Sequence, residues 1–506
     1  MIYGAWGSCA MGPPCSKKPS MPRLTLVFVV DGLRPDSITA GDTPTLHRLR
    51  AEGVSFAAGH AAFPTVTRVN AATIATGAHP RRHGILGNTL YVPSVDPRGA
   101  FSNDDWRKLV ALRRAHPTAR AHTLAQRLAS RGRTLAAVSS GSTGSAFLLN
   151  PDAPEGVGVL VNGYFGAGHV AFPPDVNAAI LRRFGAAPVK GGLAERFDAA
   201  VDWTQTVLKD YVLPELRPDV VINWITEPDH TQHTAGAGSP EARASIHNAD
   251  RHIGLILDGV DADVLVASDH GFGVNVGTVH VARELIEAGL KSGPDSDDLV
   301  VASSGQAMAL YVKDRALERV QKIVAFLQSR PWIGVIFTAG GSAEGSAGGA
   351  AEGTFPLELV HVDHPAWAPD ILFTFPWTSA RNAFGVAGTD VGDAGSKVTS
   401  DHGSLSPWTI RSTLLAWGPA FKRGAVVGTP AGNVDVTPTI LALHGLDGDG
   451  VDGRVLREAL VDGPDEEQVP VQTRLHTAEA GAGRYRAVVQ ISEVDGVRYV
   501  DKGWRI

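Results

Sequence analysis

Short, continuous apolar runs alternate with amphipathic stretches along most of this chain. Leu24–Val30 (LTLVFVV) has no polar face, which is typical of a strand covered on both sides. Further strands are predicted at Thr134–Ser139, Asp219–Ile225, Ala262–Ala267 and Thr413–Trp417. Helices are predicted between them at His122–Ser130, Ala194–Val212 and Pro240–Leu257, the last with Ser239 as its N-cap. This alternation predicts an α/β fold built on a doubly wound, mostly parallel sheet.

Two stretches depart from the alternation and divide the 506 residues into parts. A small α+β subdomain is predicted as an insertion, and the tail contains two alternating runs around Asp495-Gly496 that indicate a β-hairpin. The Gly/Pro/Ser-rich start reads as a disordered leader, with Met21 as an alternative first residue. The predicted parts are a leader at 1–20, the main α/β domain at 21–304 and 378–463, the inserted subdomain at 305–377, and a C-terminal β-hairpin extension at 464–506.

Composition excludes several classes of protein. With 46 basic and 52 acidic residues, the formal charge of −6 argues against a protein that grips a nucleic-acid backbone. No apolar run is long enough to span a membrane, and the start has no continuous apolar region of the kind found in signal peptides, so a cytoplasmic location is the default expectation. Both cysteines, Cys9 and Cys15, precede Met21. Any metal would therefore be held by nitrogen and oxygen ligands.

Carboxylates and imidazoles follow the predicted strands. Asp31 comes directly after the first strand, and Asp229 and Asp269 follow two others. Parallel strands collect such residues at one edge of the sheet, where three carboxylates would repel one another unless cations intervened. A single aspartate after a strand is usually a cap or turn residue, but here histidines accompany the set: His233, His270 and His402. Ligands of this kind suit two divalent ions, with Zn²⁺ favoured and Mn²⁺ or Fe as alternatives.

Thr67 is the candidate nucleophile. The segment FPTVTRVNAATIATG predicts a loop that runs into a helix ending before Gly77, with Thr67 near the helix start. One interpretation makes Thr67 only the N-cap. In the other, a divalent ion and the backbone N–H groups stabilise its deprotonated oxygen, and a pair of ions assists an in-line displacement at phosphorus.

The order of motifs resembles the alkaline phosphatase superfamily, and most closely its type I phosphodiesterase/nucleotide pyrophosphatase branch, with the phosphonoacetate hydrolases nearby. The matching motifs are D-G-x-R-P-D at Asp31–Asp36, F-P-T-x-T-x-x-N at Phe63–Asn70, T-G-x-x-P-x-x-H-G-I-x-x-N at Thr76–Asn88, E-P-D-x-x-x-H at Glu227–His233, S-D-H-G at Ser268–Gly271, and a late His-Gly at His402. The resemblance extends from about Leu24 to Leu460. It implies an alkaline-phosphatase-like fold and a metal-dependent hydrolase of phosphate esters.

The resemblance also implies a role for each matching residue. One metal would be held by Asp229, His233 and His402, and the other by Asp31, Asp269, His270 and the oxygen of Thr67. Thr67 would form a covalent phosphothreonine while a phosphodiester or pyrophosphate bond is cleaved. Asn88 would donate to a non-bridging phosphate oxygen.

The position after the nucleophile departs from the phosphodiesterase branch. That branch commonly has a phenylalanine there, which helps to hold a nucleobase, whereas this chain has Arg68. Arg68 either pairs with an anionic group of the substrate or is a solvated side chain of the first helical turn. The substrate is expected to be a small phosphate ester, pyrophosphate or phosphonate.

Three other functions compete with a phosphodiesterase. C–P cleavage of a phosphonate, as in phosphonoacetate hydrolases, and phosphomonoester hydrolysis could both use the same site. A metal-stabilised binding protein without turnover would be expected to lack a ligand or the nucleophile. A sulfatase is disfavoured because its branch needs a cysteine or serine where this chain has Thr67.

Overall fold

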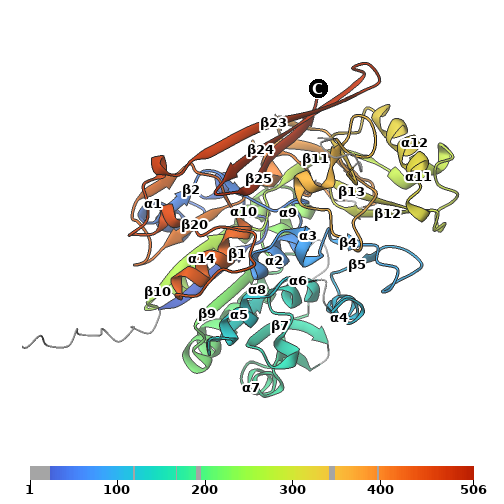
Figure 1. Ribbon diagram of the computed structural model, residues 1–506. Helices are drawn as coiled ribbons and strands as arrows, with labels where there is room; N and C mark the ends of the chain where they lie inside the picture. The colour runs from blue at the N-terminus through green and yellow to red at the C-terminus, as the bar shows by residue number, and fades with distance from the viewer. Residues whose placement is uncertain (1–22, 118–119, 167, 190–194, 341–347, 396–397) are drawn as a thin grey trace, which may run out of the picture.

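The computed structural model describes residues 23–117, 120–166, 168–189, 195–340, 348–395 and 398–506 (Figure 1). The predicted leader, its two cysteines and the predicted helix start at Ala194 lie outside these residues. Among the described helices, none combines the length and the hydrophobicity needed to cross a bilayer.

A nine-stranded sheet forms the centre of the molecule, and its order is β21-β2-β20-β10-β1-β9-β6-β7-β8. The strands are β1 (Leu24–Val30), β2 (Val54–Phe56), β6 (Leu135–Ser139), β7 (Val159–Gly166), β8 (His169–Phe172), β9 (Val220–Ile225), β10 (Ala262–Ala267), β20 (Leu414–Trp417) and β21 (Ala425–Val427). β10, β1, β9, β6 and β7 run parallel, whereas β20 and β8 run antiparallel to their neighbours. The predicted mostly parallel sheet is therefore confirmed.

Helices cover both faces of this sheet because its central strands are apolar on both sides (Figure 1). In β1, Leu26 and Phe28 belong to one core cluster, and Val27 and Val29 belong to the other. The first cluster includes residues of α1 (Pro44–Glu52), α7 (Pro174–Phe184), α8 (Asp198–Val207), the π-helical segment Leu208–Leu216 and α10 (Pro240–Leu257). The second includes residues of α2 (Thr67–Thr76), α4 (Trp106–Ala115), α5 (Leu124–Ala129), α6 (Thr143–Leu149) and α14 (Val436–Leu443).

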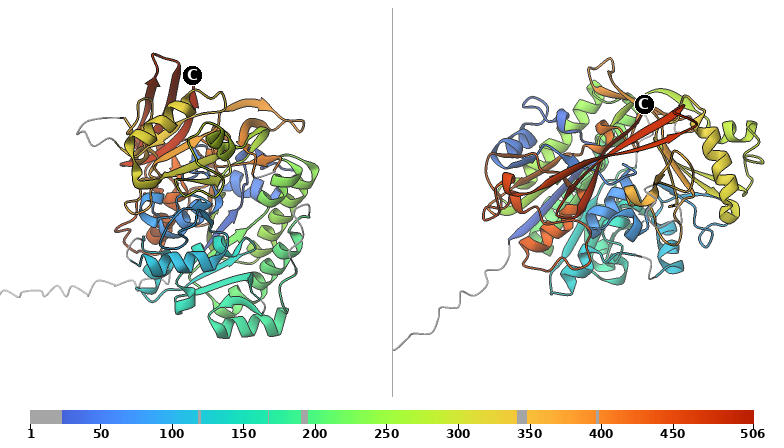
Figure 2. Two further views of the ribbon diagram at one scale, coloured as in Figure 1. Left: turned by 90° about the vertical axis from the view of Figure 1, so that its right-hand side faces the viewer. Right: turned by 45° about the horizontal axis from the view of Figure 1, so that its top comes forward.

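A five-stranded sheet forms the inserted part, which lies to one side of the central sheet (Figure 2). Its order is β12-β13-β16-β14-β15, and only the β14–β15 pair is parallel. The strands are β12 (Leu299–Ser304), β13 (Ala307–Val312), β14 (Ile336–Thr338), β15 (Phe355–Pro356) and β16 (Ile371–Thr374), accompanied by α11 (Val281–Glu287) and α12 (Leu317–Gln328). This sheet begins before the predicted boundary at residue 305, because β12 pairs with β13 through a tight turn at Gly305.

Two further sheets complete the fold. A four-stranded sheet has the order β17-β18-β11-β19, with β11 (Gly273–Val279), β17 (Trp377–Arg381), β18 (Ala387–Asp393) and β19 (Ser400–Asp401). The C-terminal sheet consists of β23 (Val471–Ala480), β24 (Tyr485–Val494) and β25 (Val497–Arg505). β24 and β25 form the predicted hairpin around Asp495-Gly496, and both turn residues have positive φ. β23 was not predicted, because its first residues are exposed and largely polar.

Asp390 on β18 makes the stability of the fold depend on pH. Burial raises the pKa of Asp390 to about 8, the charge of Asp401 adds to this rise, and the hydrogen bond from Ser404 opposes it. In the unfolded chain the reference pKa is 3.8. Between these two values the folded protein keeps a proton that the unfolded chain releases, so the free energy of unfolding falls as pH rises.

We therefore expect Asp390→Asn, which cannot ionise, to gain stability relative to the wild type as pH rises from about 5 to about 8. Thermal melts of both proteins across this range test the expectation. A difference in melting temperature that stays constant with pH would show that Asp390 does not titrate in this way.

Candidate active site

Three aspartates meet at one edge of the central sheet. Asp31 directly follows β1, Asp269 comes two residues after β10, and Asp229 is the first residue of α9 (Asp229–Ala235), which follows β9. β10, β1 and β9 are adjacent and parallel, so their carboxyl ends lie side by side. Nε2 of His270 lies 3.0 Å from Asp269 Oδ2, 3.6 Å from Asp31 Oδ1 and 3.9 Å from Asp229 Oδ1. The predicted gathering of carboxylates is thus present.

Three histidines surround these carboxylates in a common orientation. His233 lies one turn after Asp229 on α9, His270 follows Asp269, and His402 follows β19. Each ring donates its Nδ1 hydrogen to a backbone carbonyl at 2.9 Å, with Ser400, Gly271 and Thr65 as the respective acceptors. Nε2 is therefore the ring nitrogen that each histidine directs at the carboxylates. Hydrogen bonds from the outer ring nitrogen to a backbone carbonyl orient histidine ligands in metal sites.

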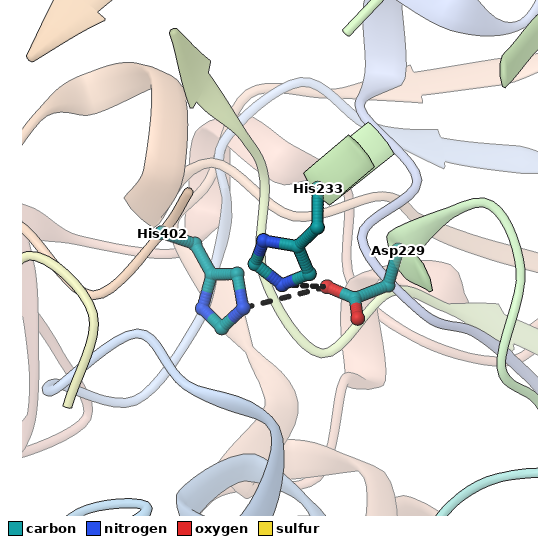
Figure 3. Close-up of side chains that lie close together, drawn as sticks. All are labelled: Asp229, His233 and His402. Carbon is teal, nitrogen blue, oxygen red and sulfur yellow. Dashed lines mark ion pairs between the residues drawn. The ribbon is translucent and has the colours of Figure 1, made fainter. Parts of the chain in front are cut away.

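The carboxylates and imidazoles form two groups that share Asp229. One group contains Asp229, His233 and His402, and the other contains Asp31, Asp229 and His270; within each, the candidate ligand atoms lie within 4.8 Å of one another. Figure 3 shows the imidazoles of His233 and His402 next to each other on one side of the Asp229 carboxylate, each with its Nε2 at 3.4 Å from the same oxygen, Oδ1.

Asp229 therefore occupies a more central place than the resemblance implies, since the resemblance assigns it to one metal only. Asp269 lies beside the second group, and its Oδ1 accepts a hydrogen bond from Gly32 N at 3.0 Å.

Burial and the charges of neighbouring groups shift the pKa values of these carboxylates and imidazoles. Burial raises the pKa of Asp31 well above its usual value, and the charges of Asp269 and Asp229 add to the rise. Asp229 has its pKa lowered, because His233 and His402 outweigh the effect of burial. Burial alone would lower the pKa of His233, but Asp229 and then Asp401 raise it to about 9. The cluster thus combines negative charges that repel one another with imidazoles that partly compensate them.

The donor set fits divalent cations. Asp31 Oδ1 and Asp229 Oδ1 are buried and accept no hydrogen bond from any residue that the structure describes. Burial of carboxylate oxygens that accept no hydrogen bond is unfavourable unless a proton or a cation compensates them. Oxygen and imidazole nitrogen together, without thiolate, suit Zn²⁺ and similar first-row ions.

Thr67 is the first residue of α2, and its hydroxyl faces this cluster. The residue is 7% exposed, and Oγ1 lies 3.5 Å from His270 Nε2. Val66 occupies the N-cap position of α2, so the interpretation of Thr67 as the N-cap is wrong. The physical reason is the extended backbone of Val66, which places the cap one residue earlier. The Thr67 hydroxyl is therefore not used to cap its own helix.

Asn88 lies next to the start of α2. Its Oδ1 accepts a hydrogen bond from the backbone N–H of Arg68 at 3.1 Å, which orients the amide so that Nδ2 points away from that contact. The backbone N–H of Asn88 donates to Ser304 Oγ at 2.9 Å, at the end of β12. The inserted sheet thus helps to hold Asn88 beside Thr67.

Several residues that support the site were not predicted. Trp224 on β9 donates from Nε1 to Asp31 Oδ2 at 3.0 Å, and Asn433 donates from Nδ2 to the carbonyl of Asp269 at 2.9 Å. Trp224 lies near the end of a predicted strand, so a search of strand ends could have found it. Asn433 is more than 160 positions from Asp269 in the chain, and no local pattern identifies it.

Comparisons with known proteins identify relatives of this chain. The model of the family described as type I phosphodiesterase / nucleotide pyrophosphatase matches residues 25–329. Venom phosphodiesterase 2 of Crotalus adamanteus is 26% identical over 256 residues, which cover 49% of this chain and 26% of the venom protein. Human ectonucleotide pyrophosphatase/phosphodiesterase family member 1 is 25% identical over 262 residues, which cover 49% of this chain and 23% of the human protein. The match thus extends over about a quarter of the length of these curated relatives.

Solved structures share the fold over most of the chain. Phosphonoacetate hydrolase from Sinorhizobium meliloti 1021, in complex with phosphonoformate, has a TM-score of 0.60 at 20% identity and covers 84% of this chain and 96% of its own. Human ectonucleotide pyrophosphatase/phosphodiesterase 5 has a TM-score of 0.57 at 16% identity and covers 87% of this chain and 100% of its own. An inactive variant of the murine form of that protein, solved in complex with AMP, has a TM-score of 0.54 at 16% identity and covers 84% of this chain and 96% of its own.

Proposed function

The chain belongs to the type I phosphodiesterase/nucleotide pyrophosphatase family, and on that premise we propose that it hydrolyses phosphodiester or pyrophosphate bonds with two divalent metal ions and a covalent phosphothreonine on Thr67. The observation that carries this proposal is the position of Thr67 Oγ1, 3.5 Å from His270 Nε2 at the first residue of α2. A hydroxyl at this place lies next to the group of Asp31, Asp229 and His270.

The residues that would hold the metals follow from the two groups. Asp229, His233 and His402 would hold one ion, and Asp31, Asp269, His270 and the Thr67 hydroxyl would hold the other, with Asp229 between them. When bound, such ions supply Lewis-acid stabilisation of phosphoryl oxygens and lower the pKa of a neighbouring hydroxyl. Zn²⁺ is the proposed metal, because the ligands are oxygen and imidazole nitrogen.

The side chains of the protein carry the chemical steps. Thr67 Oγ1 gives its proton to water and attacks phosphorus, an O–P bond forms as the bond from phosphorus to the leaving oxygen breaks, and the leaving oxygen takes up a proton from water. The start of α2 is the positive end of the helix dipole, so it favours negative charge on the attacking oxygen. Nδ2 of Asn88 donates to a non-bridging oxygen as charge builds there. Water then attacks the phosphothreonine, releases the phosphoryl product and restores Thr67.

A second candidate activity uses the same residues on a different bond. C–P cleavage of a phosphonate is favoured by Arg68, which stands where an aromatic residue would help to hold a nucleobase. Phosphomonoester hydrolysis is the third alternative for the same site.

Paired aryl substrates distinguish these activities. Zinc-loaded protein is expected to hydrolyse bis(4-nitrophenyl) phosphate at least about tenfold faster, in kcat/KM, than 4-nitrophenyl phosphate. The reverse order would favour a phosphomonoesterase. A protein that binds two zinc ions and cleaves neither ester would contradict the phosphodiesterase proposal, and release of phosphate from phosphonoacetate would then identify the C–P alternative.

A further inference from the structure

Arg68 extends from the second residue of α2, directly after the candidate nucleophile. Its side chain is half-buried, and its Nε donates a hydrogen bond to Asn103 Oδ1 at 3.0 Å. Its backbone N–H donates to Asn88 Oδ1. The guanidinium therefore does not extend freely into solvent, as the alternative of a solvated side chain requires, but is tied to the loop that carries Asn88.

The residue that holds Arg68 is itself held firmly. Asn103 is fully buried, its Nδ2 donates to the Gly87 carbonyl at 2.9 Å, and its backbone N–H donates to the Asn88 carbonyl at 3.1 Å. Because Asn103 Oδ1 cannot move without breaking these contacts, Nε of Arg68 has a fixed position. The guanidinium is thus preorganised next to Asn88 and Thr67.

The outer edge of the guanidinium is available to a ligand. Within the part of the chain that the structure describes, Nη1 and Nη2 donate no hydrogen bond and form no ion pair. Because Nε is occupied by Asn103, an oxyanion would bind end-on, with its two oxygens on Nη1 and Nη2.

The charges around Arg68 favour an anionic ligand once metals are bound. Burial lowers the pKa of Arg68, and the charges of Asp104, Asp31 and Asp229 oppose this effect. Two divalent ions would carry four positive charges against the three negative charges of Asp31, Asp229 and Asp269. The three carboxylates of the site would then be compensated, and of the negative charges that act on Arg68 only that of Asp104 would remain.

We propose that Arg68 binds a second anionic group of the substrate, a carboxylate or a phosphate, so that the site selects phosphate esters or phosphonates that carry an additional oxyanion. This inference rests on the proposed function, since it places the reacting phosphoryl group at Thr67. It assigns a specificity-determining role to the residue that replaces the aromatic side chain common in the family.

A series of three phosphonates tests the proposal by binding alone. Methylphosphonate has one anionic group, phosphonoacetate adds a carboxylate, and methylenediphosphonate adds a second phosphonate. Isothermal titration of each into zinc-loaded protein is expected to give at least about tenfold tighter binding for one or both of the larger ligands, because a charge-assisted bidentate contact is among the stronger ones. Tighter binding of phosphonoacetate alone shows that Arg68 binds a carboxylate. Tighter binding of methylenediphosphonate alone shows that Arg68 binds a phosphate-like group.

Variants of Arg68 determine whether the guanidinium causes this gain. Arg68→Met is expected to bind all three ligands with similar affinity, and Arg68→Lys is expected to retain only part of the gain, because an ammonium cannot form the bidentate contact. The matched control is Arg81→Met, which removes a partly exposed arginine paired with Asp363 and is expected to behave like the wild type. Zinc content and melting temperature are measured for each protein to exclude loss of metal or fold.

Two results would overturn the proposal. In the first, the wild type binds phosphonoacetate and methylenediphosphonate no more tightly than methylphosphonate. In the second, Arg68→Met still binds one of the larger ligands more tightly than methylphosphonate. Hydrolysis of bis(4-nitrophenyl) phosphate is followed in parallel. A protein without any turnover contradicts the proposed function, whereas turnover without an affinity gain contradicts only the role of Arg68.

Discussion

Thr67→Ala is expected to lower kcat for bis(4-nitrophenyl) phosphate by at least about a thousandfold. The substitution removes the only protein atom proposed to bond to phosphorus. The aspartates and the Nδ1 contacts of the histidines do not involve the Thr67 side chain, so the metal-binding groups are expected to stay in place.

Two variants and one direct observation accompany this measurement. Thr67→Ser keeps a hydroxyl at the start of α2 and is expected to retain measurable turnover. Thr73→Ala is the matched control on the same helix, because Thr73 Oγ1 donates to the Val69 carbonyl and contacts His83 instead of the aspartates. Rapid quenching of the wild type followed by mass spectrometry should detect one added phosphoryl group on the peptide that contains Thr67. Retention of a tenth or more of the activity in Thr67→Ala would rule out a covalent role for this residue.

Asp229→Asn is expected to weaken both metal sites, whereas substitution of a histidine from one group should weaken only one. Asp229 Oδ1 lies 3.4 Å from Nε2 of His233 and of His402, and 3.9 Å from Nε2 of His270. The charge of this one carboxylate therefore acts on both groups. We expect at least about a tenfold loss of affinity at each site and a fall in kcat/KM of about a thousandfold or more.

Metal content after dialysis provides the readout. The wild type should retain two zinc ions per chain, Asp229→Asn fewer than one, and His402→Gln about one, since His402 belongs to a single group. Circular-dichroism melts of the metal-free proteins show whether each variant folds. If Asp229→Asn keeps one tightly bound ion, Asp229 serves a single metal, as the family resemblance implies.

The central sheet could be predicted because each of its main strands is recognisable from its own run of apolar residues. Ala262–Ala267 matches β10, and the predicted strands at 134–139, 219–225 and 413–417 each begin one residue before β6, β9 and β20. Runs of Val, Ile, Leu and Ala in strands buried on both faces leave little ambiguity. The antiparallel direction of β20 had no such signal, because it depends on the path of the chain through the inserted sheets.

Part of the candidate site could also be predicted from the sequence, and part could not. Asp31, Asp229 and Asp269 could be placed together from strand ends alone, and the family resemblance, which the family model confirms, supplied roles for Thr67 and Asn88. The contacts of Asn88 with Ser304 and of Arg68 with Asn103 could not be predicted, because they join segments that only the folded chain brings together. The individual roles of the site residues stay predictions until the variants above are measured.

The candidate metal-binding residues are spread along the chain from Asp31 to His402, and this has a consequence for biosynthesis. His402 completes the group of Asp229 and His233. The central sheet is also completed late, because β20, which lies between β2 and β10, consists of residues 414–417. At usual translation speeds, roughly 20 to 70 seconds pass between synthesis of Asp31 and synthesis of His402. During that interval Asp31, Asp229 and His270 can meet once residue 270 has been made, but the group of Asp229 and His233 still lacks His402. If the proposed metals bind as described, the group of Asp229, His233 and His402 can take up its ion only after residue 402 has been made, late in the synthesis of the chain.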